Sequence, residues 1–320
     1  MSSDRFAALS PEQLELLRLL LAEEGLDPAR LPIPRAPRPG GRAPASYAQQ
    51  RLWFLHQLAP ESPRYNLPIA VELRGALAPG ALAAAMGDVV RRHEMLRTRF
   101  AADDGRPAQV VLDALPARAL PLPWVDLSGL PAAERQPELH RLLAACIDLP
   151  FDLSQAPLHR ATLFRLDHQA WVMLLVAHHI IADAWSMSIW VEEAAAAYRA
   201  RSLGEPSALP PLAVQYADFA HWQRRRLAGP LLDREADHWR QRLDGLLPIA
   251  LPADRPRGAA VAHRRGMRRA LLARPLAAAL HALARRRGVT LFVTLAAALD
   301  LLLARYCGSE DIAIGTPVAG

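Results

Sequence analysis

The chain has 320 residues, of which 52% are hydrophobic and 22% charged, and its formal net charge is +6. This composition excludes a chain that is disordered along most of its length, because apolar residues are plentiful and the net charge is small. All 38 basic residues are arginine and 32 acidic residues offset them, so the basic isoelectric point is poor evidence for nucleic-acid binding.

Cysteine usage and hydropathy indicate the compartment. Cys146 and Cys307 form neither a metal-ligand spacing nor a disulfide framework, which favours a reducing environment. The first residues lack the cationic and apolar blocks of a signal peptide. The longest apolar run, residues 291–303, contains Thr294 and Asp300 and is too short to cross a membrane. We therefore expect a cytoplasmic protein that binds neither a membrane nor a nucleic acid.

The N-terminal part shows a helix and then a Pro-rich stretch. Residues 10–25 are predicted to be helical, since Ser10 can cap the start and Gly25 can close the end. Its leucine face could dock to another chain, which makes residues 1–30 a possible docking segment. Packing on this chain is the slightly favoured alternative. Residues 31–45 are rich in proline and glycine, and we expect an extended linker there.

From residue 46 onward the pattern mixes helices and strands, which predicts an α/β class with mixed sheets. The expected helices cover residues 46–57, 79–94, 132–146, 186–199, 216–227, 231–243, 276–287 and 291–306. The expected strands cover residues 66–74, 96–100, 109–112, 158–166, 171–179, 265–271 and 312–315. The strand at 171–179 is almost wholly apolar, which predicts a central position in its sheet.

The segment most indicative of chemistry is His-His-Ile-Ile-Ala-Asp-Ala-Trp-Ser at residues 178–186, here called the signature segment. Successive strand residues point to opposite faces, so His178 and His179 cannot both enter one cleft. We expect one to be packed and the other presented. Asp183 can orient a neighbouring group, pair with an arginine, or cap a helix that starts near Ser186. A histidine beside a carboxylate is a common acid/base arrangement.

Residue spacing alone does not make this segment catalytic. A histidine pair in an apolar strand is more often part of a core. No Glu-x-x-His or cysteine set accompanies the pair, so the spacing gives no zinc site. Ser186 lacks the Gly-x-Ser-x-Gly elbow of a serine nucleophile.

The wider pattern decides between these interpretations, because five motifs occur in the order of one family. The signature segment resembles the His-His-x-x-x-Asp-Gly signature of nonribosomal peptide synthetase condensation domains and their chloramphenicol-acetyltransferase-like relatives. The other four motifs are similar at residues 46–55 (SYAQQRLWFL), 92–100 (RHEMLRTRF), 216–222 (YADFAHW) and 314–319 (IGTPVA). The resemblance runs from about residue 45 to the end.

Two departures from the family pattern stand out. The glycine after the aspartate is Ala184 here, which implies either a negative φ or a mildly strained turn. Members of the family also continue beyond the fifth motif, where the next residue is an arginine that suits a pairing with Asp183. The resemblance therefore implies a C-terminally truncated domain that is inactive alone.

The resemblance implies a two-lobed, V-shaped fold with a tunnel between the lobes. Residues 46–225 would form the complete N-terminal lobe and residues 226–320 part of the C-terminal lobe. By motif position, His179 is the active residue, His178 is buried and Asp183 is structural. Supporting roles fall to Ser186, Arg51 and Arg97, and for both arginines we expect ion pairs that support the fold before a place in the tunnel.

The function implied is amide-bond formation between a donor acyl or peptidyl thioester and an acceptor aminoacyl thioester. Both substrates would arrive on phosphopantetheine arms of donor and acceptor peptidyl carrier proteins, and the chain itself would bind no cofactor. Adjacent synthetase modules, with an adenylation domain downstream, would be further partners. The alternatives are epimerisation of a carrier-bound residue and a non-catalytic platform that recruits carriers.

Other motif residues are expected to support the structure. Four tryptophans are predicted to pack in the core or between lobes: Trp53, Trp185, Trp190 and Trp222. The arginine clusters at residues 224–226, 264–265, 268–269 and 285–287 are predicted to be solvated faces, with steering of acidic carriers as the sharper alternative.

Overall fold

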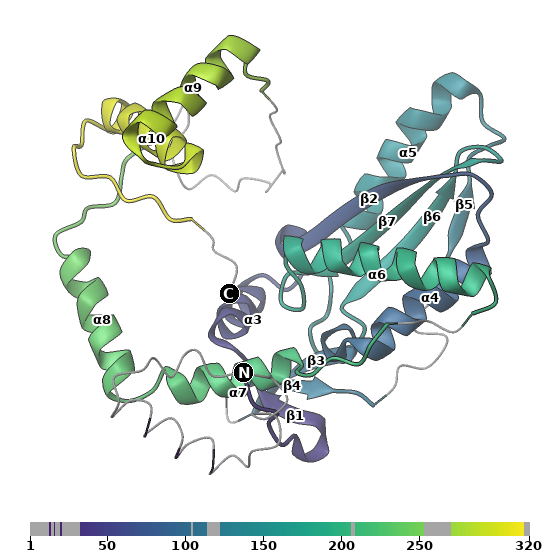
Figure 1. Ribbon diagram of the computed structural model, residues 1–320, viewed down its shortest axis with the longest axis horizontal. Helices are drawn as coiled ribbons and strands as arrows, with labels where there is room; N and C mark the ends of the chain where they lie inside the picture. The colour runs from purple at the N-terminus through teal and green to yellow at the C-terminus, as the bar shows by residue number, and fades with distance from the viewer. Residues whose placement is uncertain are drawn as a thin grey trace. The chain divides into compact units, whose positions relative to one another are not determined.

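The computed structural model describes residues 13, 16, 20, 33–103, 105–113, 122–205, 209–252 and 270–316 (Figure 1). The chain forms two compact units that divide between Leu231 and Leu232, a few residues after the boundary expected at 225/226. Helices and two sheets make up the first unit, and helices make up the described part of the second.

A four-stranded mixed sheet holds the centre of the first unit, in the order β2-β7-β6-β5. Its strands are β2 (Asn66–Arg74), β5 (Trp124–Asp126), β6 (His159–Arg165) and β7 (Ala170–His178). β7 is antiparallel to β2 and β6, whereas β5 is parallel to β6. Every residue of β2 pairs with β7, from Asn66 opposite His178 to Arg74 opposite Ala170. The central position predicted for the apolar strand is confirmed.

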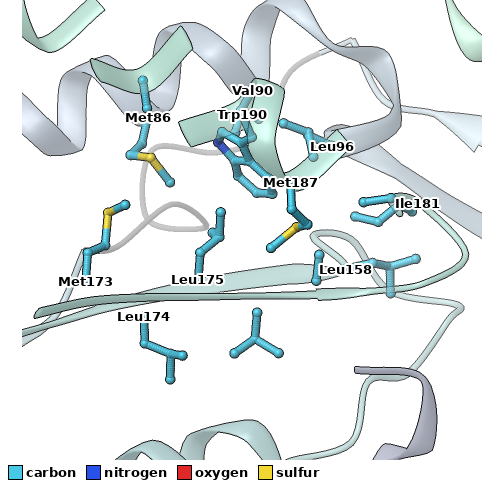
Figure 2. Packing of buried hydrophobic residues seen from close by; sticks show 14 of the residues in the cluster. Met86, Val90, Leu96, Leu158, Met173, Leu174, Leu175, Ile181, Met187 and Trp190 are labelled. Atoms are coloured by element: carbon cyan, nitrogen blue, oxygen red, sulfur yellow. The ribbon is translucent and has the colours of Figure 1, made fainter. Parts of the chain in front are cut away.

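Helices cover the sheet and close the core. α4 (Pro79–Arg92) and α6 (Ala184–Ser202) pack against each other, and α5 (Ala132–Ile147) packs against β2 and β7. Figure 2 shows Met173 and Leu175 of β7 on the side of α4 and α6, while Leu174 points to the opposite side. Both sets of side chains are buried, which explains the apolar run of this strand. The side chains that meet Met173 and Leu175 include Met86, Val90, Met187 and Trp190.

A second, antiparallel sheet has the order β1-β4-β3. Its strands are β1 (Arg42–Pro44), β3 (Thr98–Asp103) and β4 (Arg106–Val111), and the 3-10 turn η4 (Glu94–Arg97) leads into β3. β3 and β4 correspond to the short strands predicted at 96–100 and 109–112, with shifted ends.

The Pro-rich stretch differs from the linker that we expected at 31–45. After the 3-10 turn η2 (Pro39–Gly41), its last residues form β1, and Ala43 is buried. Gly41 has a φ of +71°, and a Cβ there would lie 2.4 Å from the Val111 carbonyl oxygen, so only glycine fits. Proline is tolerated in an edge strand, so the same composition suits β1 as well as a linker.

Two further helices flank this sheet. α3 (Tyr47–Leu58) is followed by the 3-10 turn η3 (Pro63–Tyr65), and α7 (Tyr216–Arg226) packs near β1 and η4. Arg224 of α7 corrects the expectation of a solvated arginine. Its Nε donates to the Ala45 carbonyl at 2.8 Å, its Nη2 donates to Gln50 Oε1 at 2.5 Å, and its guanidinium lies 4.0 Å from the Tyr47 ring centroid.

The second unit contains α9 (Arg274–Arg287) and α10 (Leu291–Cys307), which pack together, while α8 (Pro230–Arg242) spans the division between the units. Several large apolar side chains of α10 are exposed, among them Phe292 at 61% and Leu301 at 68%. The strand predicted at 312–315 is not formed, because a strand needs a partner and these residues pair with none in the described part of the chain.

Two predicted elements fall mainly outside the described residues. Within the helix predicted at 10–25, only Gln13, Leu16 and Leu20 are described, and these are helical. The strand predicted at 265–271 is described only at Ala270 and Leu271, which are not in a strand. Among the described residues, no single helix is long and apolar enough to cross a membrane. α9 and α10 meet that measure only as a pair, bent by 103°.

Candidate active site

The signature segment begins at the end of β7 and leads into α6. β7 ends at His178, residues 179–181 form a turn, and α6 starts at Ala184. His178 is 2% exposed, whereas His179 is exposed. One imidazole is packed and its neighbour is presented, as expected, but the cause is the turn: the strand predicted at 171–179 ends at His178, so His179 lies just beyond it.

His178 is held as a neutral ring. Its Nδ1 accepts the backbone N–H of Ile180 at 3.1 Å, so the proton of the neutral ring is on Nε2. The rings of His56, Tyr65 and Phe151 lie 6.0 to 6.3 Å from it, centroid to centroid. Burial, with smaller effects from the charges of His56 and His179, lowers the pKa of His178 to about 3.

The backbone of His179 is fixed although its side chain is open. Its N–H donates to the Tyr65 carbonyl at 2.8 Å, which ties the start of the turn to η3. The imidazole makes no hydrogen bond with any residue that the structure describes, so both ring nitrogens can serve a bound molecule.

Asp183 is the N-cap of α6. Its Oδ1 accepts the Ser186 backbone N–H at 2.7 Å and the Ser186 hydroxyl at 2.6 Å. Partial burial acts to raise the pKa of Asp183, but the hydrogen bonds from Ser186 and from its own backbone N–H, together with the charge of His179, outweigh it, and the pKa lies below its ordinary value. Of the three roles open to Asp183 in the sequence, the described residues show the cap, and none of their arginines pairs with it.

Ala184, in place of the family's glycine, causes no strain. It is the first residue of α6, and helical residues have negative φ. Of the two alternatives, a negative φ or a mildly strained turn, the negative φ therefore holds. The backbone N–H and the hydroxyl of Ser186 both donate to Asp183. The Ser186 hydroxyl therefore belongs to the helix cap and is not activated as a nucleophile.

The first motif contributes a contact that the sequence analysis missed. Gln49 is 2% exposed, and its Nε2 donates to the Ile180 carbonyl at 3.2 Å. Ser46 caps α3, and its hydroxyl lies 3.0 Å from the Tyr216 hydroxyl. Gln49 and Tyr216 belong to the first and fourth family motifs, so the motifs marked both residues as notable. The sequence did not reveal that Gln49 meets Ile180, because 131 residues separate the two.

The two motif arginines differ. Arg97 makes the expected ion pair, with its Nη2 3.9 Å from Glu94 Oε1, and its Nη1 donates to the Leu112 carbonyl. Arg51 is exposed and has no ion pair with a described residue, contrary to our expectation. Its charge on the surface of α3 needs no partner because water solvates it.

Among the four tryptophans, Trp185 lies outside the core of the first unit. Trp190 is buried at 3% and Trp53 packs against the core, as expected. Trp185 is 74% exposed, because the second residue of α6 faces away from the sheet that Met187 and Trp190 contact.

No group of histidine, cysteine or carboxylate side chains in the described ranges has the arrangement of a metal site. The site therefore consists of an exposed imidazole, a buried neutral imidazole beside it, and a capped turn that fixes both. Such a site can hydrogen-bond a substrate or exchange a proton with it at His179.

This fold and this site define a class. Residues 40–320 match the family model of the condensation domain, so the chain belongs to the condensation domain family of nonribosomal peptide synthetases. The expected α/β fold of that family is confirmed.

Three relatives illustrate the match. Phosphinothricin tripeptide synthetase PhsC of Streptomyces viridochromogenes is 42% identical, covering 98% of this chain and 29% of that protein. Chondramide synthase cmdD of Chondromyces crocatus is 42% identical over 286 residues, which cover 88% of this chain and 7% of that protein. The structure of the complex of the X-domain and OxyB from teicoplanin biosynthesis matches with a TM-score of 0.71 and 33% identity, covering 85% of this chain and 59% of that one. The chain thus spans only a part of each of these relatives.

Proposed function

We propose that this chain is an amide-forming condensation domain. A donor acyl or peptidyl thioester and an acceptor aminoacyl thioester would arrive on the phosphopantetheine arms of two carrier proteins. The acceptor amine attacks the donor carbonyl, the C–S bond breaks, and the donor thiol leaves with the proton that the amine loses. The product is an amide on the acceptor arm.

The observation that carries this proposal is the presentation of His179. Its backbone is fixed by Tyr65 and its imidazole is exposed, beside a His178 that stays neutral. A thioester is already activated, so no covalent enzyme intermediate is needed, and alignment of the two reactants supplies most of the acceleration. His179 then accepts the amine proton or hydrogen-bonds the tetrahedral intermediate.

The surrounding assignments belong to the same proposal. Residues 46–225 would be the N-terminal lobe and residues 226–320 part of the C-terminal lobe, in a cytoplasmic synthetase with an adenylation domain downstream. The chain would bind no cofactor of its own, because phosphopantetheine stays attached to the carriers.

A second candidate is a recruiting platform, which the similarity to an X-domain solved with OxyB favours. A platform has no use for an exposed His179 on a fixed backbone. Epimerisation, the third candidate, needs a second acid/base group in the other lobe, and the fit of the first and second motifs to condensation domains favours amide formation over it.

The test is a single-turnover transfer between two loaded carriers, run on the natural polypeptide that contains these residues. His179→Ala is expected to lower amide formation strongly and to leave the melting temperature unchanged. His168→Ala is the matched control, because His168 is an exposed histidine in the turn between β6 and β7. Equal rates for the wild type and His179→Ala contradict catalysis, and an inverted α-carbon without a new amide indicates epimerisation.

A further inference from the structure

The carbonyl of Ile180 is the part of the signature turn that a distant side chain fixes. Ile180 lies directly after His179 and is 3% exposed. Gln49 Nε2 donates to its carbonyl at 3.2 Å, while the N–H of the same residue donates to His178 Nδ1 at 3.1 Å. Both polar backbone atoms of Ile180 are thus held by side chains, one from α3 and one from β7.

All polar atoms of the Gln49 amide are used. Its Oε1 accepts the Ser46 backbone N–H at 3.0 Å, and its Nε2 also lies 3.4 Å from Met95 Sδ. Because an N–H faces Oε1 and a carbonyl faces Nε2, only one orientation of the amide satisfies its neighbours. The Ile180 carbonyl therefore meets a donor whose position is set by α3.

Helix capping alone does not account for a glutamine here. Gln49 forms a capping box with Ser46, and glutamate serves that motif equally well. A glutamate would place a carboxylate oxygen against the Ile180 carbonyl, where no donor would remain. The contact with the turn after His179 is thus the feature that requires an amide.

We propose that Gln49 is a positioning residue for His179, acting through its hydrogen bond to the Ile180 carbonyl. This inference rests on the proposed function of His179. The hydrogen bonds of Gln49 go to neither histidine, and its effect is to hold the residue that follows His179 so that the imidazole keeps one direction. Loss of the bond lets the turn shift and leaves His179 chemically intact but misaligned.

The N-terminus of α3 is itself anchored to α7. Ser46 bonds both Gln49 and the Tyr216 hydroxyl. Burial raises the pKa of Tyr216, the bond to Ser46 opposes this, and the negative charge of Asp183 raises it further. The bond between Ser46 and Tyr216 thus ties the start of α3 to α7, and α3 carries the amide that meets the Ile180 carbonyl.

The first experiment compares two buried glutamines in the natural polypeptide. Gln49→Met removes the donor to Ile180. Gln109→Met is the control, because Gln109 is also fully buried and its Nε2 donates to a backbone carbonyl, that of Pro44, at 2.7 Å. We expect Gln49→Met to lower kcat for amide formation about 10- to 100-fold with KM for the loaded carriers unchanged. Amide hydrogens of His179 and Ile181 should also exchange faster, and Gln109→Met should do neither.

The second experiment uses Gln49→Glu, which keeps the capping box. A buried carboxyl takes up a proton more readily than an exposed one, and the protonated acid can donate to the Ile180 carbonyl. The ratio of variant to wild-type kcat is therefore expected to rise as the pH falls. A flat ratio would overturn the positioning role, because a purely structural defect gives no such rescue.

The outcomes separate the two proposals. If the wild type forms amides and Gln49→Met matches it in kcat and hydrogen exchange, the positioning role is wrong and the proposed function stands. If the wild type forms no amide, the proposed function is wrong and a role for Gln49 in that reaction falls with it. Faster exchange at His179 in Gln49→Met would then still show that Gln49 fixes the turn.

Discussion

The Nδ1 atom of His178 accepts the Ile180 N–H, so this imidazole gains a proton at that atom only by giving up the hydrogen bond. His159 is a second buried histidine in the first unit. Its Nε2 lies 3.1 Å from the Leu96 carbonyl and its ring is 4.8 Å from the Trp190 ring, centroid to centroid. Burial lowers the pKa of His159 to about 4, although the bond to Leu96 opposes this.

These two histidines predict a loss of stability in mild acid. Both have folded-state pKa values, about 3 and about 4, below the ordinary value of 6.5, so the unfolded chain binds protons first as the pH falls. Stability is fully present above pH 6.5 and decreases below it. At pH 5 each histidine should lower the free energy of unfolding by roughly 2 kcal/mol. Urea unfolding at pH 7.5 and 5 measures this, and His159→Phe should reduce the difference. An equal difference in the variant would contradict the assignment.

Asp183 gives a prediction about its capping role. Asparagine and aspartate are both good N-caps, so Asp183→Asn should cost only a few tenths of a kcal/mol, whereas Asp183→Ala should cost about 1 kcal/mol. The free energies of unfolding of the two variants provide the comparison. A large loss in Asp183→Asn would show that the charge itself is needed, as expected for a pairing with an arginine.

Asp218 of α7 is 1% exposed and binds residues 36–38, which precede β1. Its Oδ1 accepts the Ala36 N–H at 2.8 Å and lies 2.5 Å from Arg38 Nη2. Asp218→Ala should destabilise the first unit by about 3 kcal/mol, because Arg38 and a backbone N–H lose a buried partner. Asp237→Ala is the control, since Asp237 pairs with Arg240 on the surface of α8 and should cost under about 1 kcal/mol. Similar losses in both variants would argue against the network.

The exposed face of α10 predicts self-association of this chain. Large apolar side chains gathered on one helix are uncommon on a soluble monomer and promote association. Leu301→Arg, at a position that is 68% exposed, should lower the association measured by sedimentation velocity. Arg285→Glu on the exposed surface of α9 is the control. A wild-type chain that stays monomeric at high concentration would contradict this expectation.

Local sequence patterns were sufficient for most elements. The apolar run before His178 indicated a central strand, and residues 66–74 were predicted with the bounds that β2 has, because side-chain periodicity and turn residues act over a few positions. Residues 312–315 were predicted as a strand and are not one, since local β-propensity needs a neighbouring strand to take effect.

Long-range contacts limited what the sequence revealed about the site. Motif position identified His179 as the presented histidine, and the turn that begins after β7 exposes it. The contact of Gln49 with Ile180 could not be predicted, because nothing local marks which of many buried amides meets which carbonyl. Arg224 shows the same limit, since a cluster of arginines looks solvated until the fold places one beside Tyr47 and Ala45.

The pairing of β2 with β7 has a consequence for synthesis on the ribosome. Asn66 pairs with His178, which is synthesised 112 residues later. At a translation rate of ~5–20 residues per second, this delay is on the order of ten seconds. During that time β2 has no partner for either edge, although Leu67, Ile69, Val71 and Leu73 already make it apolar on one face. The nascent chain therefore depends on its early helices, or on a chaperone, to shield this strand until β7 is translated.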